Sequence, residues 1–284
     1  MTQPIMKKGQ GDGLRIQLAD WEGKGKTVLG IHGITANCRG FDTVAKNISP
    51  ENRVLSMDLR GRGLSDKPET GYSISHHCKD MAAVLDDQGI DQAIVMGHSL
   101  GAYISLEFAV EYASRAEKLI LFDGGGDLSI EQWVNVGAGI QPSVDRLGKV
   151  FPSMNDYKDL MKKAPFLNPW TDVMDTFYEY EVEEVEGGVR SRVNPEHITE
   201  ERTNLAMVQI ADYFAKIKCP VLVLRAPLGM VEEKHILLPD DVVERMKKNI
   251  SDVQFFDVDG TNHFTIIFSE HPERDKVIRE FIAS

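Results

Sequence analysis

The chain of 284 residues has little cysteine, and its cysteines have no paired spacing. Three cysteines, Cys38, Cys78 and Cys219, cannot all pair within one chain, and none stands in a CxxC pattern. Disulfide frameworks of secreted domains use even numbers of closely spaced cysteines. The sequence therefore predicts reduced thiols in a cytoplasmic protein.

Positive charge and long apolar runs are also scarce. The 32 Lys and Arg residues are outnumbered by 44 Asp and Glu residues, which gives a formal net charge of -12. Such a chain lacks the basic surface that binds phosphate backbones, and anionic membrane surfaces repel it. Residues 1–13 are polar and hold no apolar core of a secretory signal. Apolar runs such as residues 221–224 have the length of strands, far below the roughly 20 residues of a membrane helix. We expect neither a nucleic-acid nor a membrane partner.

Short apolar runs alternate with stretches of helical periodicity in the first 123 residues. Residues 14–21 alternate apolar and polar side chains, which is typical of an exposed edge or hairpin strand. Helices are predicted over 73–88 and 99–112, and buried strands over 27–31, 53–57, 93–96 and 118–122. The apolar runs are too continuous for a sheet with one wet face. They predict an α/β fold with a mostly parallel sheet covered on both faces.

The alternation stops after Asp123 and resumes near residue 220. Between about residues 124 and 214 no strand-like run recurs, and the segment is rich in aromatic and Met residues. Strands are predicted again at 220–225 and 253–258, and a last helix at 272–282. We predict a core domain formed by residues 1–126 and 216–284, with a helical cap, residues 127–215, inserted between its two parts. Most aromatic residues of the cap are expected in its own core.

One motif points to chemistry. Gly97-His-Ser-Leu-Gly101 matches G-x-S-x-G and lies directly after a predicted strand and before a predicted helix. The turn between them is so sharp that side chains at Gly97 and Gly101 would collide with their surroundings. The bend presents the hydroxyl of Ser99 at the tip of the sheet, beside a helix N-terminus that favours negative charge. Ser99 is the predicted nucleophile.

A serine hydroxyl needs a base to accept its proton. His263 lies on the loop between the last predicted strand and the last helix, where such a base is expected. The other seven histidines lie in glycine motifs, at a helix start, in the cap or among charged residues. The oxyanion that forms during attack needs two donors, which we assign to the backbone N–H groups of Leu100 and, in the loop after the strand at 27–31, Ile34.

These features together resemble the α/β-hydrolase superfamily, in its branch with a serine nucleophile and a cap. The resemblance covers nearly the whole chain and rests on His32-Gly33, the D-x-R-G-x-G-x-S run at 58–65, the motif at 97–101 and Asp259-Gly-Thr-Asn-His263. It implies an eight-stranded sheet with helices on both faces, a cap after the sixth strand, and hydrolysis through an acyl-enzyme without metal or cofactor. Gly33, His98 and Trp133 are expected to contact the substrate.

The acid of the triad is left open between two regions. Most members of the superfamily place an Asp after the seventh strand, but residues 225–239 contain none, and only Glu232 and Glu233 could serve there. A minority branch uses an acid after the sixth strand, where Asp123 stands. Position favours Asp123, whose carboxylate would hold the tautomer of His263. Alternatively, Asp123 caps a glycine-rich turn.

The resemblance implies cleavage of an ester or lactone, or of an amide, in a small and largely apolar substrate. A C–C bond hydrolase of the same fold is the alternative within enzymes, and a small-molecule receptor is the alternative outside them. Asp58, Arg60 and Arg62 are expected to fix the loop after their strand, although one arginine could instead contact an anionic substrate. The chain is expected to work as a monomer or homodimer.

Overall fold

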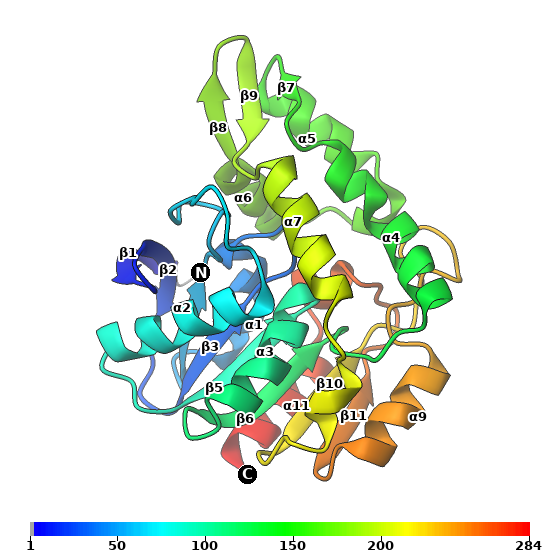
Figure 1. Cartoon of the computed structure of the whole chain (residues 1–284). Coiled ribbons are helices and arrows are strands. Elements are labelled where there is room, and N and C mark those ends of the chain that lie inside the picture. The colour runs from blue at the N-terminus through cyan, green and yellow to red at the C-terminus, as the bar shows by residue number, and fades with distance from the viewer. Residues whose placement is uncertain (1–2) are drawn as a thin grey trace.

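The computed structural model describes residues 3–284, and an eight-stranded sheet forms its centre (Figure 1). The strand order is β1-β2-β4-β3-β5-β6-β10-β11. The first two strands pair antiparallel with their neighbours, and the other six run parallel. The bounds are β1 Ile5–Gln10, β2 Arg15–Trp21, β3 Thr27–Ile31, β4 Arg53–Met57, β5 Ala93–His98, β6 Ala116–Phe122, β10 Val221–Arg225 and β11 Val253–Asp257. The predicted mostly parallel sheet is confirmed.

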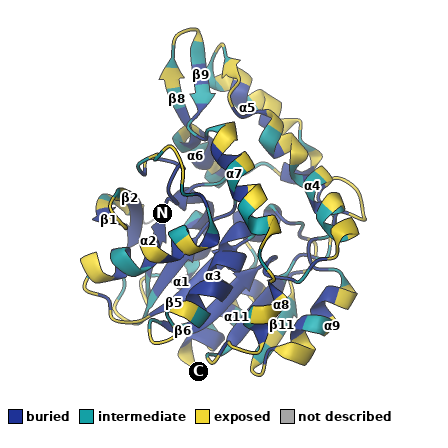
Figure 2. Cartoon of the chain, viewed as in Figure 1, coloured by how far each residue is buried: buried dark blue, intermediate teal, exposed yellow. Residues whose placement is uncertain are grey.

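The sheet is covered on both faces, and alternate side chains of each strand enter one of two cores. Leu119 and Leu121 of β6 pack into one core, whereas Ile120 and Phe122 pack into the other. The first core includes residues of α2 (Ile74–Asp87), α3 (Leu100–Glu111) and α9 (Asp240–Asn249). The second includes residues of η1 (Cys38–Phe41), α1 (Asp42–Ile48), α10 (Thr265–Phe268) and α11 (Pro272–Ala283). Figure 2 accordingly shows the sheet and α3 as mostly buried.

The N-terminal edge agrees with one of the two predicted alternatives. The strand predicted at 14–21 as an exposed edge or a hairpin strand is β2, which forms a hairpin with β1 and is buried at six of its seven residues. Residues 5–10 have no apolar alternation, since β1 is held by backbone pairing to β2 and carries two lysines, Lys7 and Lys8. Lysines on an edge strand discourage pairing with other chains.

Between β6 and β10 the chain leaves the sheet and forms the inserted segment (residues 127–215), which stands over one end of the sheet (Figure 1). Its helices are α4 Ile130–Asp145, α5 Met154–Lys162, η2 Pro165–Leu167, α6 Asp172–Glu181, α7 Pro195–Ala206 and α8 Ala211–Phe214. The expectation of a segment without strands is wrong. A small sheet of order β7-β9-β8 joins Val150–Phe151, Gly188–Ser191 and Val182–Val185. These strands have only two to four residues, and β8 and β9 carry charged side chains, so they leave no apolar run in the sequence.

Helix α7 is fastened to the loop after β4 by buried polar contacts. One carboxylate oxygen of Glu201 accepts a hydrogen bond from the guanidinium of Arg62, and its other oxygen lies 2.7 Å from Nε2 of His77. All three side chains are at most 1% exposed. The amide of Asn204 donates to the carbonyl of Tyr72 at 2.6 Å. These contacts fix one side of the inserted segment relative to the sheet. No helix within residues 3–284 combines the length and apolar content needed to cross a bilayer.

Candidate active site

Ser99 occupies the bend between β5 and α3, as predicted. Its φ of 56° and ψ of −120° lie outside the regions that non-glycine residues prefer. A Cβ atom added at Gly97 would overlap the carbonyl of Gly101, and one added at Gly101 would overlap the carbonyl of Ile31. The two glycines therefore allow the tight approach of strand and helix that exposes the serine hydroxyl.

His263 and Asp123 complete a row of contacts with this serine. Nε2 of His263 lies 3.0 Å from Oγ of Ser99, and Nδ1 lies 2.8 Å from Oδ2 of Asp123. The side chains of His263 and Asp123 are 4% and 2% exposed. Because an acid beside Nδ1 requires a proton there, Nε2 is left free to accept the serine proton. The arrangement suits removal of a proton from Ser99.

Of the acids left open by the sequence, Asp123 is the one that contacts the imidazole. It follows β6, and its second carboxylate oxygen accepts the N–H of Ala226 at 3.2 Å. Its φ of 43° makes the turn that aims the carboxylate toward the loop of His263. Glu232 and Glu233 are exposed on the loop after β10, and Glu232 lies 3.1 Å from Lys234.

The two residues expected to donate to an oxyanion lie beside the serine. Leu100 is the first residue of α3, and Ile34 follows β3; both line a cavity together with Ser99. The loop of Ile34 approaches closely, since a Cβ atom on Gly33 would lie 3.1 Å from Cβ of Ser99. Unpaired N–H groups at a helix start favour an anion. The placement is compatible with the predicted donor pair.

His98 has a role that the sequence did not indicate. Its Nε2 donates a hydrogen bond to the carbonyl oxygen of His263 at 2.8 Å, and the two rings lie 4.6 Å apart. Burial holds the pKa of His98 well below its usual value, so the ring is neutral at neutral pH. A contact across 165 positions of the chain leaves no local signal in the sequence. His98 thus braces the backbone of the predicted base.

Two cavities meet at Ser99. The larger, about 190 Å³, is walled mainly by apolar residues of α3, α4 and α7 and includes Trp133. The smaller, about 40 Å³, is lined by Gly33, His98, His263 and aromatic residues such as Phe177. Substrate contact was expected at Gly33, His98 and Trp133. The first two line the smaller cavity, and Trp133 lines the larger one. Sequence reasoning did not single out the further lining residues Tyr103, Ile140, Arg202 and Leu205.

Asp58 and Arg60 fix their loop, in agreement with the expectation. Asp58 accepts hydrogen bonds from the N–H groups of Cys38 and Leu64 (2.7 and 2.8 Å) and from the hydroxyl of Tyr180 (2.6 Å). Burial nevertheless raises the pKa of the Asp58 carboxyl.

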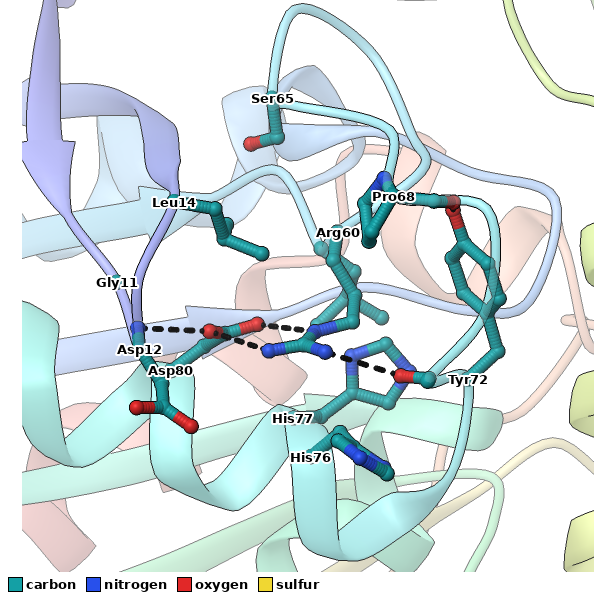
Figure 3. Close-up of polar contacts among 12 residues, drawn as sticks. Gly11, Asp12, Leu14, Arg60, Ser65, Pro68, Tyr72, His76, His77 and Asp80 are labelled. Carbon is teal, nitrogen blue, oxygen red and sulfur yellow. Dashed lines mark hydrogen bonds and ion pairs between the residues drawn. The ribbon is translucent and has the colours of Figure 1, made fainter.

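Figure 3 shows the neighbouring arginine network. The guanidinium of Arg60 spans both oxygens of Asp80 at 2.7 and 2.8 Å and donates to the carbonyl of Gly71 at 3.1 Å. Arg62 pairs with Glu201 as described above, and neither arginine lines the two cavities at Ser99.

The remaining residues with reactive or metal-binding side chains do not form a second centre. The three cysteines are free, and Cys38 and Cys78 are buried. Burial raises the pKa of the Cys78 thiol far above its usual value, which makes it a poor nucleophile. Across residues 3–284, no three His, Cys, Asp or Glu side chains are grouped so that they could hold a metal ion.

Comparison with known proteins adds relatives in sequence and in structure. A 2-(acetamidomethylene)succinate hydrolase of Mesorhizobium japonicum is 36% identical over 102 residues, 36% of this chain and 37% of that protein. A serine hydrolase-like protein of Danio rerio is 25% identical over 277 residues, 91% of this chain and 82% of that protein. A 2-hydroxy-6-oxo-2,4-heptadienoate hydrolase of Pseudomonas putida is 28% identical over 134 residues, 45% of this chain and 48% of that protein. The chain thus spans only about a third of the length of the first of these relatives.

The crystal structure of an E-2-(acetamidomethylene)succinate hydrolase superposes with a TM-score of 0.87 and 23% identity, covering 99% of this chain and 100% of that one. At this identity the likeness concerns the fold alone. The sequence profile of the alpha/beta hydrolase fold matches residues 26–270, which include the bend at Ser99 and the loop of His263. The chain therefore belongs to the alpha/beta hydrolase fold family.

Proposed function

We propose that the protein is a serine hydrolase that cleaves an ester or lactone of a small, largely apolar substrate, with residues 127–215 acting as its cap. The observation that carries the proposal is the unbroken row from Ser99 through His263 to Asp123, with contacts of 3.0 and 2.8 Å. The apolar walls of the larger cavity support the choice of an apolar substrate.

The mechanism follows from the positions of these groups. His263 accepts the proton of Ser99 as its oxygen attacks the carbonyl carbon, and Asp123 stabilises the imidazolium that results. The N–H groups of Leu100 and Ile34 stabilise the oxyanion, each contributing about 3–4 kcal/mol to the lowering of the barrier. His263 then protonates the leaving group, and a water molecule activated by the same imidazole hydrolyses the acyl-enzyme.

A C–C bond hydrolase is the second candidate. The relative from Pseudomonas putida is named for a substrate with an oxo group and no ester, and hydrolysis of a ketone breaks a C–C bond. The same serine, histidine and oxyanion donors would serve that reaction. A comparison of ester, lactone, amide and vinylogous diketone substrates at equal concentration separates the candidates, since kcat/KM on the diketone panel exceeds that on esters only for a C–C hydrolase.

Labelling and turnover test the proposal itself. We expect a fluorophosphonate probe to label the wild-type protein and the control Ser114→Ala, whose serine is exposed. Ser99→Ala is expected to lose labelling and about 10⁴- to 10⁶-fold of its turnover of p-nitrophenyl esters. A folded wild-type protein that neither labels nor turns over any panel substrate would contradict the proposal and favour a receptor that binds in the same cavity.

A further inference from the structure

Arg202 is the one charged side chain among the residues that line the larger cavity at Ser99. It lies on α7 with Leu205 and Ala206, which line the same cavity. Positions three and four apart share a face of a helix, so these three residues form the side of α7 that looks toward Ser99. The rest of the lining is apolar or aromatic, apart from Ser99 and Gly137.

Arg202 also stands apart from the other arginines. The chain has fourteen, and thirteen of them donate to a carboxylate or a backbone carbonyl. Within residues 3–284, Arg202 has no ion pair and no hydrogen bond. The carboxylates next to it in sequence are already engaged, since Glu201 pairs with Arg62 and Glu200 accepts the N–H groups of Gly71 and Tyr72. Its five N–H donors therefore remain available.

The opposite wall of the cavity leaves space for the guanidinium group. Nη2 of Arg202 lies 3.6 Å from the position that a Cβ atom would take at Gly137 of α4. The exposed side chain of Arg202 thus extends from α7 to the neighbourhood of Gly137 on α4. A long side chain at position 137 would occupy the space in which a ligand could meet the guanidinium.

We propose that Arg202 binds a carboxylate of the substrate, so that the preferred ester or lactone carries an acid group at the far end of an apolar segment. This inference rests on the proposed function. A guanidinium matches a carboxylate with two parallel hydrogen bonds. The lining offers one cation, which balances one negative charge, whereas a phosphate monoester carries up to two. Because the protein as a whole has a net charge of -12, an anionic substrate needs a local cation of this kind.

A pair of substrates that differ only in charge provides the test. Mono-p-nitrophenyl esters of dicarboxylic acids of several chain lengths are compared with their methyl-capped, neutral counterparts. In the wild type we expect the ratio of kcat/KM for the acid to that for the neutral ester to exceed one at the best chain length. Arg202→Gln is expected to lower that ratio about five- to tenfold, mainly through KM, and Arg202→Lys by less. Arg190→Gln, which removes an exposed arginine paired with Glu183, is the matched control and keeps the ratio.

Two outcomes overturn the inference: a ratio that Arg202→Gln leaves unchanged, or a wild-type preference for esters with a terminal phosphonate over those with a carboxylate. Binding distinguishes this failure from a failure of the proposed function. Calorimetric titration of Ser99→Ala with the monomethyl ester of the same dicarboxylic acid needs no turnover. If its affinity falls in Ser99→Ala/Arg202→Gln, the carboxylate site stands even where hydrolysis is absent.

Discussion

Backbone strain is confined to two residues of the proposed triad. Within residues 3–284, Ser99 and Asp123 are the two non-glycine residues with positive φ, at 56° and 43°. Such conformations cost about 1–3 kcal/mol each and persist where the surrounding structure enforces them. Ser99 is held between β5 and α3, and Asp123 between β6 and the loop that donates the N–H of Ala226. The strain thus aims the hydroxyl and the carboxylate at the same imidazole.

Asp123→Asn tests the assignment of the acid. Asn tolerates a positive φ as well as Asp does, so the variant should fold. We expect kcat to fall about 10⁴-fold, because an amide facing Nδ1 of His263 favours the wrong tautomer. Turnover of a p-nitrophenyl ester is the measurement, and the double variant Glu232→Gln/Glu233→Gln is the control with wild-type activity. Loss of activity in the Glu232→Gln/Glu233→Gln variant, together with an active Asp123→Asn, would assign the acid to Glu232 or Glu233 instead.

His98 is a positioning residue in this structure, and its replacement tests that role. His98→Leu removes the donor to the carbonyl of His263, and we expect kcat to fall about tenfold with KM nearly constant. His98→Gln keeps an N–H donor and should recover part of the loss. The pH dependence of kcat is the second readout, since a residue with a merely structural role would leave its shape unchanged. A change in KM alone would indicate substrate contact instead.

The sequence predicted part of this site. Ser99 and His263 could be located because a local motif and a position in chain order mark them. Asp123 remained one of several acids, since only the packing of two loops brings it within 2.8 Å of His263. The hydrogen bond from His98 to the backbone of His263 joins different elements, and the free guanidinium of Arg202 reflects the lack of a partner on the described neighbouring elements. No spacing within the chain records such contacts.

At the scale of elements, α7 is anchored to the core by buried polar contacts. A buried group is formed by Glu201, Arg62 and His77. Burial raises the pKa of the Glu201 carboxyl, but the interactions with His77 and Arg62 outweigh this effect and lower it to about 2. The cavity wall that carries Arg202 is therefore held in place by the buried contacts of the adjacent residue Glu201 on the same helix.

Glu201→Gln is expected to lower the free energy of unfolding by about 3–5 kcal/mol, because Arg62 would keep its buried charge without a partner. Glu196→Gln alters an exposed glutamate of the same helix and should change it by less than about 0.5 kcal/mol. Urea titration followed by circular dichroism measures both variants. A loss below about 1 kcal/mol for Glu201→Gln would contradict the account of α7 as an anchored helix.

Helices and strands were predicted well where burial requires a pattern of apolar residues in the sequence, and poorly where it does not. The runs at 93–96 and 118–122 became β5 and β6 because two-sided burial demands continuous apolar residues. Strand β1 and the small sheet β7-β9-β8 were missed, since backbone pairing of short, polar strands leaves no such run. The loop contacts of Arg60 and Asp58 were expected, but their partners Asp80 and Tyr180 could not be named from sequence.

For the whole molecule, buried groups set the response to acid. Burial lowers the pKa of His32 to about 3, below the value of 6.5 of an exposed histidine, so the unfolded chain binds more protons between these values. The contribution of His32 to the free energy of unfolding is therefore fully present above pH 6.5 and is lost as the pH decreases toward 3. Glu201 acts in the same direction, because its contribution is present above its ordinary pKa of 4.5 and is lost as the pH falls toward 2.

We expect the free energy of unfolding, measured by urea titration, to decrease continuously from neutral pH to about pH 4, at a rate of at most about 1.4 kcal/mol per pH unit for each such group. His32→Asn should flatten the part of the curve between pH 6.5 and 4.5, where Glu201 remains ionised. His271→Asn, which alters a partly exposed helix cap, is the control. A stability maximum below pH 5 would show that these groups do not govern the response.

The contact between His263 and Ser99 joins positions 164 residues apart, and that between His263 and Asp123 joins positions 140 residues apart. During synthesis the serine and the acid leave the ribosome long before the imidazole does. A nascent chain that ends before β11 carries a complete nucleophile bend and no means of activating it. Under the proposed function, hydrolysis of esters is thereby withheld from every unfinished molecule, and the recovery of turnover during refolding reports the docking of the last strand.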